Sequence, residues 1–492
     1  MILGLKPYPV MKDSGVPWLG QVPEHWELRR LRHLAEMRVS SVDKHTKVDE
    51  EPIRLCNYVD VYKNDHIRNN MTFMRATAMR EELERFRIFP GDVLITKDSE
   101  TWNDIGVPAL VVDSGADLVC GYHLALLRPF VGQIISDYLF RALQTNSIAY
   151  HFHVEANGVT RYGLSHSAIK SIRLPVPPQS EQLLIVRFLE RVDRRMRRYI
   201  RAKQKLIKLL EEQKQSIIHR AVTRGLDPNV RLKPSGTKWL GDMPEHWEVR
   251  RLKSLVHRID QGISPQAENC LAGEAWGVLK AGCVNRGIFR ELEHKRLPVS
   301  MDFDHELAIA EGDVLVSRAN GSPHLVGSVG RVTSLRFKLI LSDKTFRLVL
   351  LTDVDPDFMV LTMNSRYYRH QVEQAISGAK GLANNLPLSS LRGFFFAIPP
   401  LQEQTAIIRH LRPNINDAMR SLSRVEREVS LMHEYRTRLI ADVVTGKLDV
   451  RDVAARLPDE TEDSEVLDET AAEILFDDTT ETIDEALEPI EA

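Results

Sequence analysis

The residue groups of this chain that could carry out chemistry are few, and each has an ordinary structural explanation. Glu293-His294-Lys295 and Glu212-Gln213-Lys214 fit the acid-x-lysine pattern of metal-dependent nucleases, but a pattern this short often arises by chance. His151-Phe152-His153 carries two imidazoles with no cysteine or carboxylate ligand grouped around them, and we expect it in a strand or loop. We therefore expect no catalytic residue and no metal site.

Sequence loops that hold cofactors are also missing. An adenine methyltransferase needs an Asn/Asp-Pro-Pro-Tyr/Phe loop for the flipped base and a glycine-rich turn for S-adenosylmethionine, and neither occurs. No G-x-x-x-x-G-K-[ST] segment is present, which excludes a P-loop whose amides cradle phosphates. The sequence therefore predicts a binding protein without a cofactor of its own.

Polar side chains suited to reading DNA bases gather on four loops. Two loops follow the similar segments GDVLIT and GDVLVS, and two precede long helical segments. Side chains that donate to or accept from base edges are the means by which proteins read the major groove. Polar loops are also common on any protein surface, so solvent exposure alone is the alternative. The candidate DNA contacts are Lys97, Ser99, Trp102, Asn103, Thr160, Arg161, Tyr162, Arg318, Asn320, Ser322, Lys380, Asn384 and Asn385.

Two long segments that lack internal glycine must position these loops. Each starts with a Pro-Pro pair followed by Glu-Gln, and each repeats apolar residues in steps of three and four, which is typical of paired helices. We expect an antiparallel coiled coil, with a kink at Pro413. The predicted seam of the first helix is Ile185, Leu189, Val192, Met196, Tyr199, Leu206, Leu210 and Ile217. That of the second is Ile407, Leu411, Ile415, Ala418, Leu422, Val425, Val429, Met432 and Leu439.

The chain repeats itself at a distance of about 220 residues. Lys12–Leu31 and Lys233–Leu252 share 14 of 20 residues, including Pro-Glu-His-Trp-Glu, whereas the interiors 40–87 and 261–309 show almost no similarity. The repeated aromatic motif is better explained by packing than by a binding site. Similar frames with different interiors predict two readers of different targets, of mixed α and β structure. Asp137–Thr145 and Asp357–Arg369 are predicted short helices.

These patterns predict an α+β fold with an internal duplication. The predicted division is a first globular domain (1–176), a first long helix (177–228), a second globular domain (229–398), a second long helix (399–450) and an acidic disordered tail (451–492).

Charge is distributed unevenly along the chain. The net charge is −2, but 15 acidic and no basic residues follow Pro458, so the preceding part sets 66 basic against 53 acidic residues. The first long helix carries 13 basic and five acidic residues, whereas 399–448 carries eight and six. A basic body suits a polyanion such as DNA, although a charged helix face is often only solvated. The tail could add solubility or compete with nucleic acid.

Composition indicates a soluble cytoplasmic protein. There is no apolar run long enough for a membrane span and no secretory signal, and the four cysteines are far apart, as in reducing compartments.

Taken together, these features resemble the specificity subunit of type I restriction-modification enzymes. The resemblance rests on the two PEHWE-RRL segments, GDVLIT and GDVLVS, and the PPQSEQ and PPLQEQ helix starts, and it covers about residues 10–450. It implies two target-recognition domains, each reading half of an asymmetric split site in double-stranded DNA, joined by helical spacers. It also implies two adenine-methyltransferase subunits that bind S-adenosylmethionine and two restriction subunits that use ATP and magnesium. The acidic tail departs from the family's pattern.

Two other functions fit the residues. A stand-alone DNA-binding regulator would bind a gapped site without associated methylation, and a coiled-coil structural adaptor would bind DNA weakly and without sequence preference.

Overall fold

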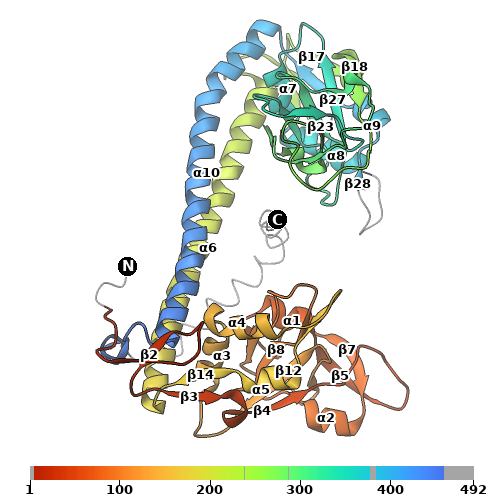
Figure 1. The fold of residues 1–492 in the computed structure, drawn as a ribbon. Helices are drawn as coiled ribbons and strands as arrows, with labels where there is room; N and C mark the ends of the chain where they lie inside the picture. The colour runs from red at the N-terminus through yellow and green to blue at the C-terminus, as the bar shows by residue number, and fades with distance from the viewer. Residues whose placement is uncertain (1–4, 238, 286, 377–383, 459–492) are drawn as a thin grey trace. The chain divides into compact units, whose positions relative to one another are not determined.

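The chain forms two units, each of which combines a globular domain with parts of two long helices. The computed structural model describes residues 5–237, 239–285, 287–376 and 384–458. One unit comprises residues 1–200 and 430–492, and the other comprises 201–429 (Figure 1). The long helices α6 (Gln179–Arg224) and α10 (Leu401–Val444) each contribute to both units. No helix in the described residues is both long and apolar enough to cross a bilayer.

The first unit is built on a five-stranded sheet with a smaller sheet beside it. The strand order of the large sheet is β4 (Ala35–Val39), β12 (Leu124–Pro129), β8 (Val93–Thr96), β10 (Pro108–Val111) and β6 (His66–Ile67). The smaller sheet has the order β11 (Leu118–Cys120), β5 (Glu51–Cys56) and β7 (Met74–Ala78). The two-stranded ladders of the first unit are β1 (Met11–Asp13) with β2 (Gln21–Pro23), β3 (Glu27–Arg30) with β14 (Arg173–Val176), and β9 (Asp98–Ser99) with β13 (Tyr162–Gly163). The short helices are α1 (Tyr58–Lys63), α2 (Arg80–Phe86), α3 (Ser136–Leu143), α4 (Asn146–Glu155), α5 (His166–Ser171) and α11 (Arg451–Ala455).

The second unit repeats this topology. Its large sheet has the order β18 (Val256–Gln261), β27 (Thr345–Leu350), β23 (Val314–Ser317), β25 (Val329–Arg331), β21 (Gly287–Phe289) and β20 (Val284–Asn285). The small sheet has the order β22 (His294–Arg296), β19 (Trp276–Leu279) and β26 (Lys338–Ile340). The ladders are β15 (Leu232–Pro234) with β16 (Asp242–Pro244), β17 (Glu248–Arg251) with β29 (Phe395–Ile398), and β24 (Ala319–Asn320) with β28 (Asn384–Asn385). Its helices are α7 (Pro356–Thr362), α8 (Arg366–Ala375) and α9 (Leu388–Gly393).

The duplicated α+β fold predicted from the sequence is confirmed, and it extends into the dissimilar interiors. Each large sheet contains one parallel pair, β10 with β6 and β25 with β21. Strand β6 ends the first sheet, whereas the short antiparallel strand β20 lies beyond β21 in the second. The middle strand of each small sheet pairs parallel on one side and antiparallel on the other. The interiors differ in their helices, because α1 and α2 of the first unit stand where the second has single 3-10 turns at Ala281–Cys283 and His305–Leu307.

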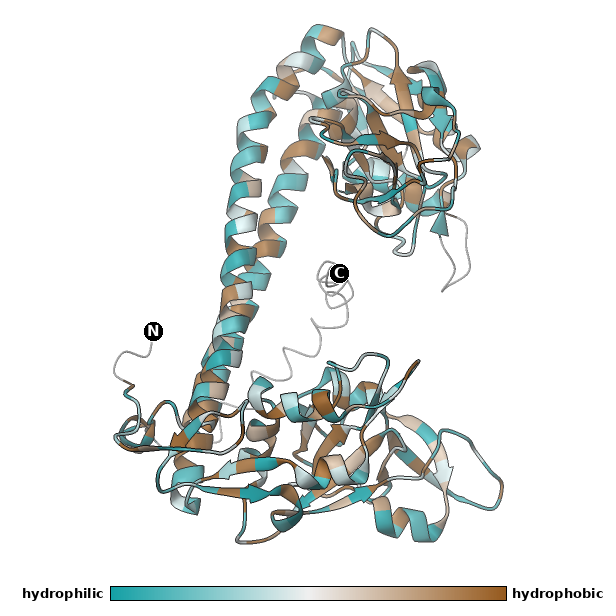
Figure 2. Cartoon of the chain, in the orientation of Figure 1, coloured by the Kyte–Doolittle hydropathy of each residue, from teal (hydrophilic) through white to brown (hydrophobic). Residues whose placement is uncertain are grey.

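The Gly-Asp-Val-Leu segments lead into β8 and β23, the central strands of the two large sheets. Gly91 and Gly312 have φ of +89° and +97°, a left-handed conformation that favours glycine. The buried Asp92 carboxylate accepts hydrogen bonds from the Phe89 amide at 2.8 Å and from the Arg128 guanidinium at 2.7 and 2.8 Å. This turn fixes the direction of the strand that leads to the candidate loop. Apolar residues concentrate on such strands (Figure 2).

Two predicted local structures were wrong. His151 and His153 lie on α4 rather than in a strand or loop, because Phe152 between them is buried in the core and the helix packs on it. The predicted helix Asp357–Arg369 is two helices, α7 and α8. The break falls at Met363–Ser365, where the Asn364 side chain donates to the carbonyls of Val329 and Val360 and takes the backbone out of the helix.

The two long helices run antiparallel in each unit. In the first, Tyr138 donates to carbonyls that flank both helices, Pro175 before α6 and Val444 at the end of α10. In the second, the end of α6 meets the start of α10, and Lys203 pairs with Glu428 at 2.8 Å. Helix α10 continues through Pro413.

The residues predicted for the α10 seam are buried or half-buried, which confirms that seam. The predicted α6 seam was wrong by one residue in part of its length. Ile200 and Ile218 are buried, and the predicted Tyr199, Leu206 and Ile217 are 42, 38 and 38 % exposed. Because α6 carries apolar residues at neighbouring positions, periodicity alone could not say which stripe faces α10.

The segment after α10 was expected to be disordered from residue 451 onward, and its first part is not. Arg451–Ala455 forms α11, with Val450 and Ala454 fully buried in the core of the first unit. The Asp449 amide donates to the Lys6 carbonyl, which joins this segment to the N-terminal region. Residues 451–458 contain two arginines and one aspartate, so the acidic composition of the tail begins only at Asp459. The remaining tail, 459–492, lies outside the described residues.

Candidate nucleic-acid interface

In each unit, the candidate loop that follows the central strand begins at a basic residue. The backbone of this residue hydrogen-bonds to two other segments of the chain. In the first unit the Lys97 amide donates to the His123 carbonyl at 2.9 Å, and the Leu164 amide donates to the Lys97 carbonyl at 2.9 Å. In the second unit Arg318 takes the same place. Its amide donates to the Lys344 carbonyl at 2.7 Å, and its carbonyl accepts from Leu386 at 2.8 Å. The frame under both loops is therefore the same.

The four loops come together two by two. Ser99 pairs with Tyr162 and Asp98 with Gly163 in the antiparallel ladder β9–β13. The second unit repeats this ladder as β24–β28, in which Ala319 pairs with Asn385 and Asn320 with Asn384. The structure thus joins loops that are distant in the sequence into one surface per unit, which we call the paired-loop surface. The predicted Lys380 lies outside the described residues.

In the first unit the paired-loop surface is organised around an acid–imidazole–guanidinium chain. The Asp98 carboxylate lies 3.0 Å from the Lys97 Nζ and 2.8 Å from the His123 Nδ1. The Arg161 Nη2 lies 3.4 Å from the other ring nitrogen of His123. With its Nδ1–H donating to Asp98, the imidazole presents an acceptor to Arg161. Asp98 therefore orients His123, and His123 orients the exposed Arg161.

The other candidates of the first unit differ in exposure. Trp102 is 50 % exposed, and Asn103 and Thr160 are exposed as well, whereas Ser99 is buried and Tyr162 is half-buried. Exposed planar and amide groups are available to a ligand, while Ser99 holds the loop in place.

Helix α1 adds two tyrosines to this surface that the sequence did not single out. Tyr58 hydrogen-bonds to Ser99, and burial raises the pKa of its phenol. Its ring stacks on Tyr62, with centroids 5.4 Å apart. The i, i+4 spacing of two tyrosines was the available signal, but nothing in the sequence placed that helix next to Ser99.

The second paired-loop surface has different chemistry. The Arg318 Nη1 donates to the Asp343 carbonyl at 2.9 Å, so this guanidinium braces its own loop. The Asn320 side chain accepts from the Ser322 amide at 3.1 Å, and the Asn384 amide nitrogen lies 3.4 Å from the Gly321 carbonyl. The surface therefore presents short amides and hydroxyls rather than the histidine and arginine of the first unit.

The repeated Pro-Glu-His-Trp-Glu motif serves to fasten each domain to its helix. In the first unit Glu181, at the start of α6, lies 3.1 Å from the Trp26 Nε1 and 2.8 Å from the His25 Nε2. In the second unit Glu403, at the start of α10, lies 3.1 Å from the Trp247 Nε1 and 2.7 Å from an imidazole nitrogen of the same motif. The histidine and the tryptophan of the motif therefore bind a helix glutamate in both units, and this structural role accounts for the repetition of the motif.

The glutamine after each glutamate fastens a second element. The Gln182 side chain accepts from the Ile135 amide at 2.9 Å, just before α3. The Gln404 side chain accepts from the Asp355 amide at 2.8 Å, just before α7. The arginines that follow the motif are also held, since Arg29 donates to Gln133 at 2.7 Å.

The segments considered for catalysis have structural roles where they are described. The buried His294 accepts from the Ala272 amide at 2.9 Å, and its other ring nitrogen lies 2.6 Å from the Glu291 carbonyl. His151 lies 2.9 Å from the Ala168 carbonyl. Within the described residues no group of three or more His, Cys, Asp or Glu side chains could hold a metal ion.

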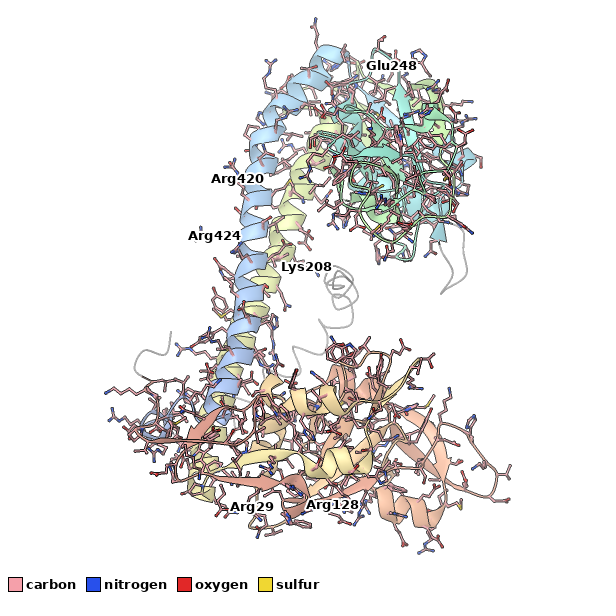
Figure 3. The ribbon with its side chains drawn as sticks, in the orientation of Figure 1. Arg29, Arg128, Lys208, Glu248, Arg420 and Arg424 are labelled. Atoms are coloured by element: carbon pink, nitrogen blue, oxygen red, sulfur yellow. The ribbon has the colours of Figure 1, made fainter. Side chains whose placement is uncertain are left out.

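Outside the paired loops, the long helices present charges and apolar side chains. In the second unit Arg420 and Arg424 on α10 project away from α6, and Lys208 projects from α6 (Figure 3). Leu206, Leu209 and Ile217 on the same part of α6 are 38, 51 and 38 % exposed.

Comparison with known proteins assigns the chain to a family. The chain matches the family described as the type I restriction modification DNA specificity domain twice, over residues 23–209 and 244–427. The chain belongs to this family. As a specificity subunit it is not itself the enzyme of a restriction-modification system, and the resemblance drawn from the sequence is confirmed.

Individual relatives extend over most of the chain. It is 24 % identical over 441 residues to the putative type I restriction enzyme MjaX specificity subunit of Methanocaldococcus jannaschii, covering 88 % of this chain and 96 % of the relative. It is 22 % identical over 415 residues to the EcoKI specificity subunit of Escherichia coli K12, covering 80 % and 82 %.

A solved structure shares the fold. A chain from work described as "Structural basis underlying complex assembly and conformational transition of the type I R-M system" aligns with a TM-score of 0.58 at 17 % identity. The alignment covers 87 % of this chain and 99 % of that one.

Proposed function

We propose that this specificity subunit recognises a bipartite, asymmetric DNA sequence, with one half read by each globular domain. The observation that carries the proposal is the paired-loop surface, which recurs on the same strand frame in both units with different side chains. Arginine suits the guanine edge and asparagine the adenine edge in the major groove. Arg161 in one unit and the Asn320–Asn384 pair in the other therefore favour two half-sites of different sequence.

Charge supports DNA as the ligand. The part of the chain before Asp459 sets 66 basic against 53 acidic residues, so the body attracts a polyanion. Phosphate contacts by lysine and arginine position a protein on the duplex without reading its sequence, which leaves recognition to the loops.

Exposed apolar residues on α6 support protein partners at the helices. The stripe Leu206, Leu209 and Ile217 is 38 to 51 % exposed, and large apolar groups in rows on a charged helix mark docking surfaces more often than isolated ones do. The partners in this proposal are two adenine-methyltransferase subunits that bind S-adenosylmethionine. Two restriction subunits that use ATP and magnesium join them, and the assembly acts in the cytoplasm, where the host DNA lies.

A domain exchange tests the proposal. Residues 40–163 are replaced by the matching segment of a relative with a different target, and the methylated motif is determined by single-molecule sequencing. We expect one half of the motif to change and the other half and the gap to stay. The matched control exchanges residues 261–385, which should change only the other half.

Three outcomes would refute the proposal. A palindromic motif would contradict different half-sites, changes in both halves after a single exchange would contradict independent readers, and gapped DNA binding without any methylation would favour a stand-alone regulator.

A further inference from the structure

A buried cluster of charges joins the first globular domain to both long helices. Asp193 on α6 accepts from Arg141 on α3 at 3.0 Å and from Arg197 at 2.8 Å. Arg436 on α10 bonds to the same carboxylate and reaches Asp65, in the loop before β6, at 2.7 Å. One carboxylate thus binds side chains from the domain and from each helix, and all five residues belong to the same unit.

The centre of the cluster is buried, whereas Arg197 and Asp65 at its edge are 36 and 33 % exposed. The side chains of Asp193 and Arg141 are 5 % exposed, and that of Arg436 is 22 % exposed. Burial alone would raise the pKa of Asp193, but the hydrogen bond from Arg436 and the charges of Arg141 and Arg197 hold this pKa well below its usual range. The carboxylate therefore stays ionised, and the two aspartates leave one of the three positive charges uncompensated within the cluster.

The cluster also borders the paired-loop surface. A cavity of about 250 Å³ is lined on one side by Asp65 and Arg436 and on another by Asn103 and Asp104 of the candidate loop. Gln144, which also lines this cavity, joins two members of the cluster, since its side chain donates to Asp65 at 3.0 Å and accepts from Arg141 at 3.1 Å. The cluster and the candidate loop therefore face the same cavity.

The second unit places apolar residues at the positions equivalent to Asp193 and Arg141. The glutamates 181 and 403 that fasten the two domains align α6 with α10, and this alignment puts Ile415 where the first unit has Asp193. Thr145 and Ser365 each donate to the carbonyl three residues earlier, which aligns α3 with α7 and puts Leu361 in the place of Arg141. Both residues pack against the core of the second unit.

Ionic and apolar side chains at these positions differ in their effect on the stability of the fold. Apolar side chains in place of a buried ion pair are often neutral or stabilising, whereas removal of one partner alone leaves a buried charge unpaired and is strongly destabilising. The second unit shows that the shared frame accepts the apolar solution. A buried ionic cluster in the first unit is thus not needed for stability, but its directional bonds allow only one arrangement of the domain on the helices.

We propose that Asp193 and Arg436 are positioning residues that fix the first recognition domain on the helix pair and so set the gap between half-sites that the subunit accepts. This inference rests on the proposed function. Adjacent base pairs are about 3.4 Å apart, so a small rotation of the domain on the helices is enough to admit a neighbouring gap length.

The test grafts the residues of the second unit into the first. The alignment of α6 with α10 also puts Met419 in the place of Arg197. Thr223 and Thr445 each donate to the carbonyl four residues earlier, and aligning them puts Lys214 in the place of Arg436. The variant Arg141→Leu/Asp193→Ile/Arg197→Met/Arg436→Lys takes at each position the residue of the other unit and is expressed with its partner subunits. The readout is methylation of a plasmid library in which the two half-sites are separated by the native gap or by one base pair more or less. Arg424→Met, which removes an 84 % exposed charge from the same helix, is the matched control.

We expect the graft to fold and to retain both half-sites, while its preference for the native gap over the neighbouring gaps falls about tenfold, and the control to behave like the wild type. A folded graft with undiminished gap preference overturns the inference. If circular dichroism shows the graft unfolded, the single variant Arg436→Lys decides by the same ratio, because lysine keeps the charge but cannot bind both aspartates with a planar fork. A wild-type complex that methylates no gapped motif refutes the proposed function instead.

Discussion

Replacement of Glu181 by alanine should destabilise the first unit more than the equivalent change at Glu403 destabilises the second. The Glu181 side chain is 6 % exposed and accepts from Tyr8, Trp26 and His25. Two of these donors are buried, and each buried donor left without an acceptor costs about 1–3 kcal/mol, so we expect a loss of about 4 kcal/mol.

The Glu403 change is the matched control that the duplication provides. Its side chain is 30 % exposed and its imidazole partner, His246, is 49 % exposed, so only the buried Trp247 loses an acceptor that water cannot replace. We expect about 2 kcal/mol here. Glu181→Gln keeps one acceptor oxygen and should fall between the wild type and the alanine variant.

Urea unfolding combined with hydrogen-exchange mass spectrometry measures both losses, because exchange in β3 and β17 assigns each loss to its own unit. Equal losses in the two units, or a loss below about 1 kcal/mol for Glu181→Ala, would refute the argument that burial of the donors sets the cost.

Two further changes test the surroundings of the helices. Burial, and secondly the charge of Arg197, lowers the pKa of His66 to about 4, so the folded state resists a proton that the unfolded chain accepts near pH 6.5, and stability should fall by about 2–3 kcal/mol from pH 7.5 to 4.5. His66→Phe should remove most of this slope in urea titrations, and an unchanged slope would contradict the assignment. Gly446, at φ +75°, has no room for a Cβ beside Pro23, whereas Gly225, at φ +71°, faces the side chain of Glu403. Gly446→Ala should therefore cost about 2 kcal/mol more than Gly225→Ala in thermal unfolding, and a reversed order would show that the backbone can shift.

The frame of the fold was predictable because its residues occur twice. In both halves a glutamate binds a tryptophan and so holds the domain on its helix, which requires the same two side chains each time. The turns before the central strands likewise require Gly-Asp in both halves. Repetition in the sequence therefore indicated structure. The seam of α10 followed the predicted spacing of three and four residues, although Leu431 and Tyr435 next to it are 50 and 40 % exposed.

The position of the α6 seam was not predictable, because Tyr199 and Ile200, and likewise Ile217 and Ile218, are neighbouring apolar residues. Only contact with α10 decides which of each pair is buried. Isoleucine, without a hydroxyl to hydrate, takes the inner position beside Tyr199.

The pairing of the candidate loops could not be read from the sequence either. Each ladder joins only two residues on each side, which is too short for an alternation of polar and apolar residues to show. His123 was missed for the same reason: its link from Asp98 to Arg161 exists only once three separate segments have met.

The central claim, that this chain directs methylation to a gapped asymmetric DNA sequence, is tested most directly by mapping adenine methylation across the host genome by single-molecule sequencing with the gene present and deleted. We predict one split motif with two different halves whose methylation disappears on deletion and returns when the gene is restored. An unchanged methylation map in a host that expresses the methyltransferase subunits would contradict the claim.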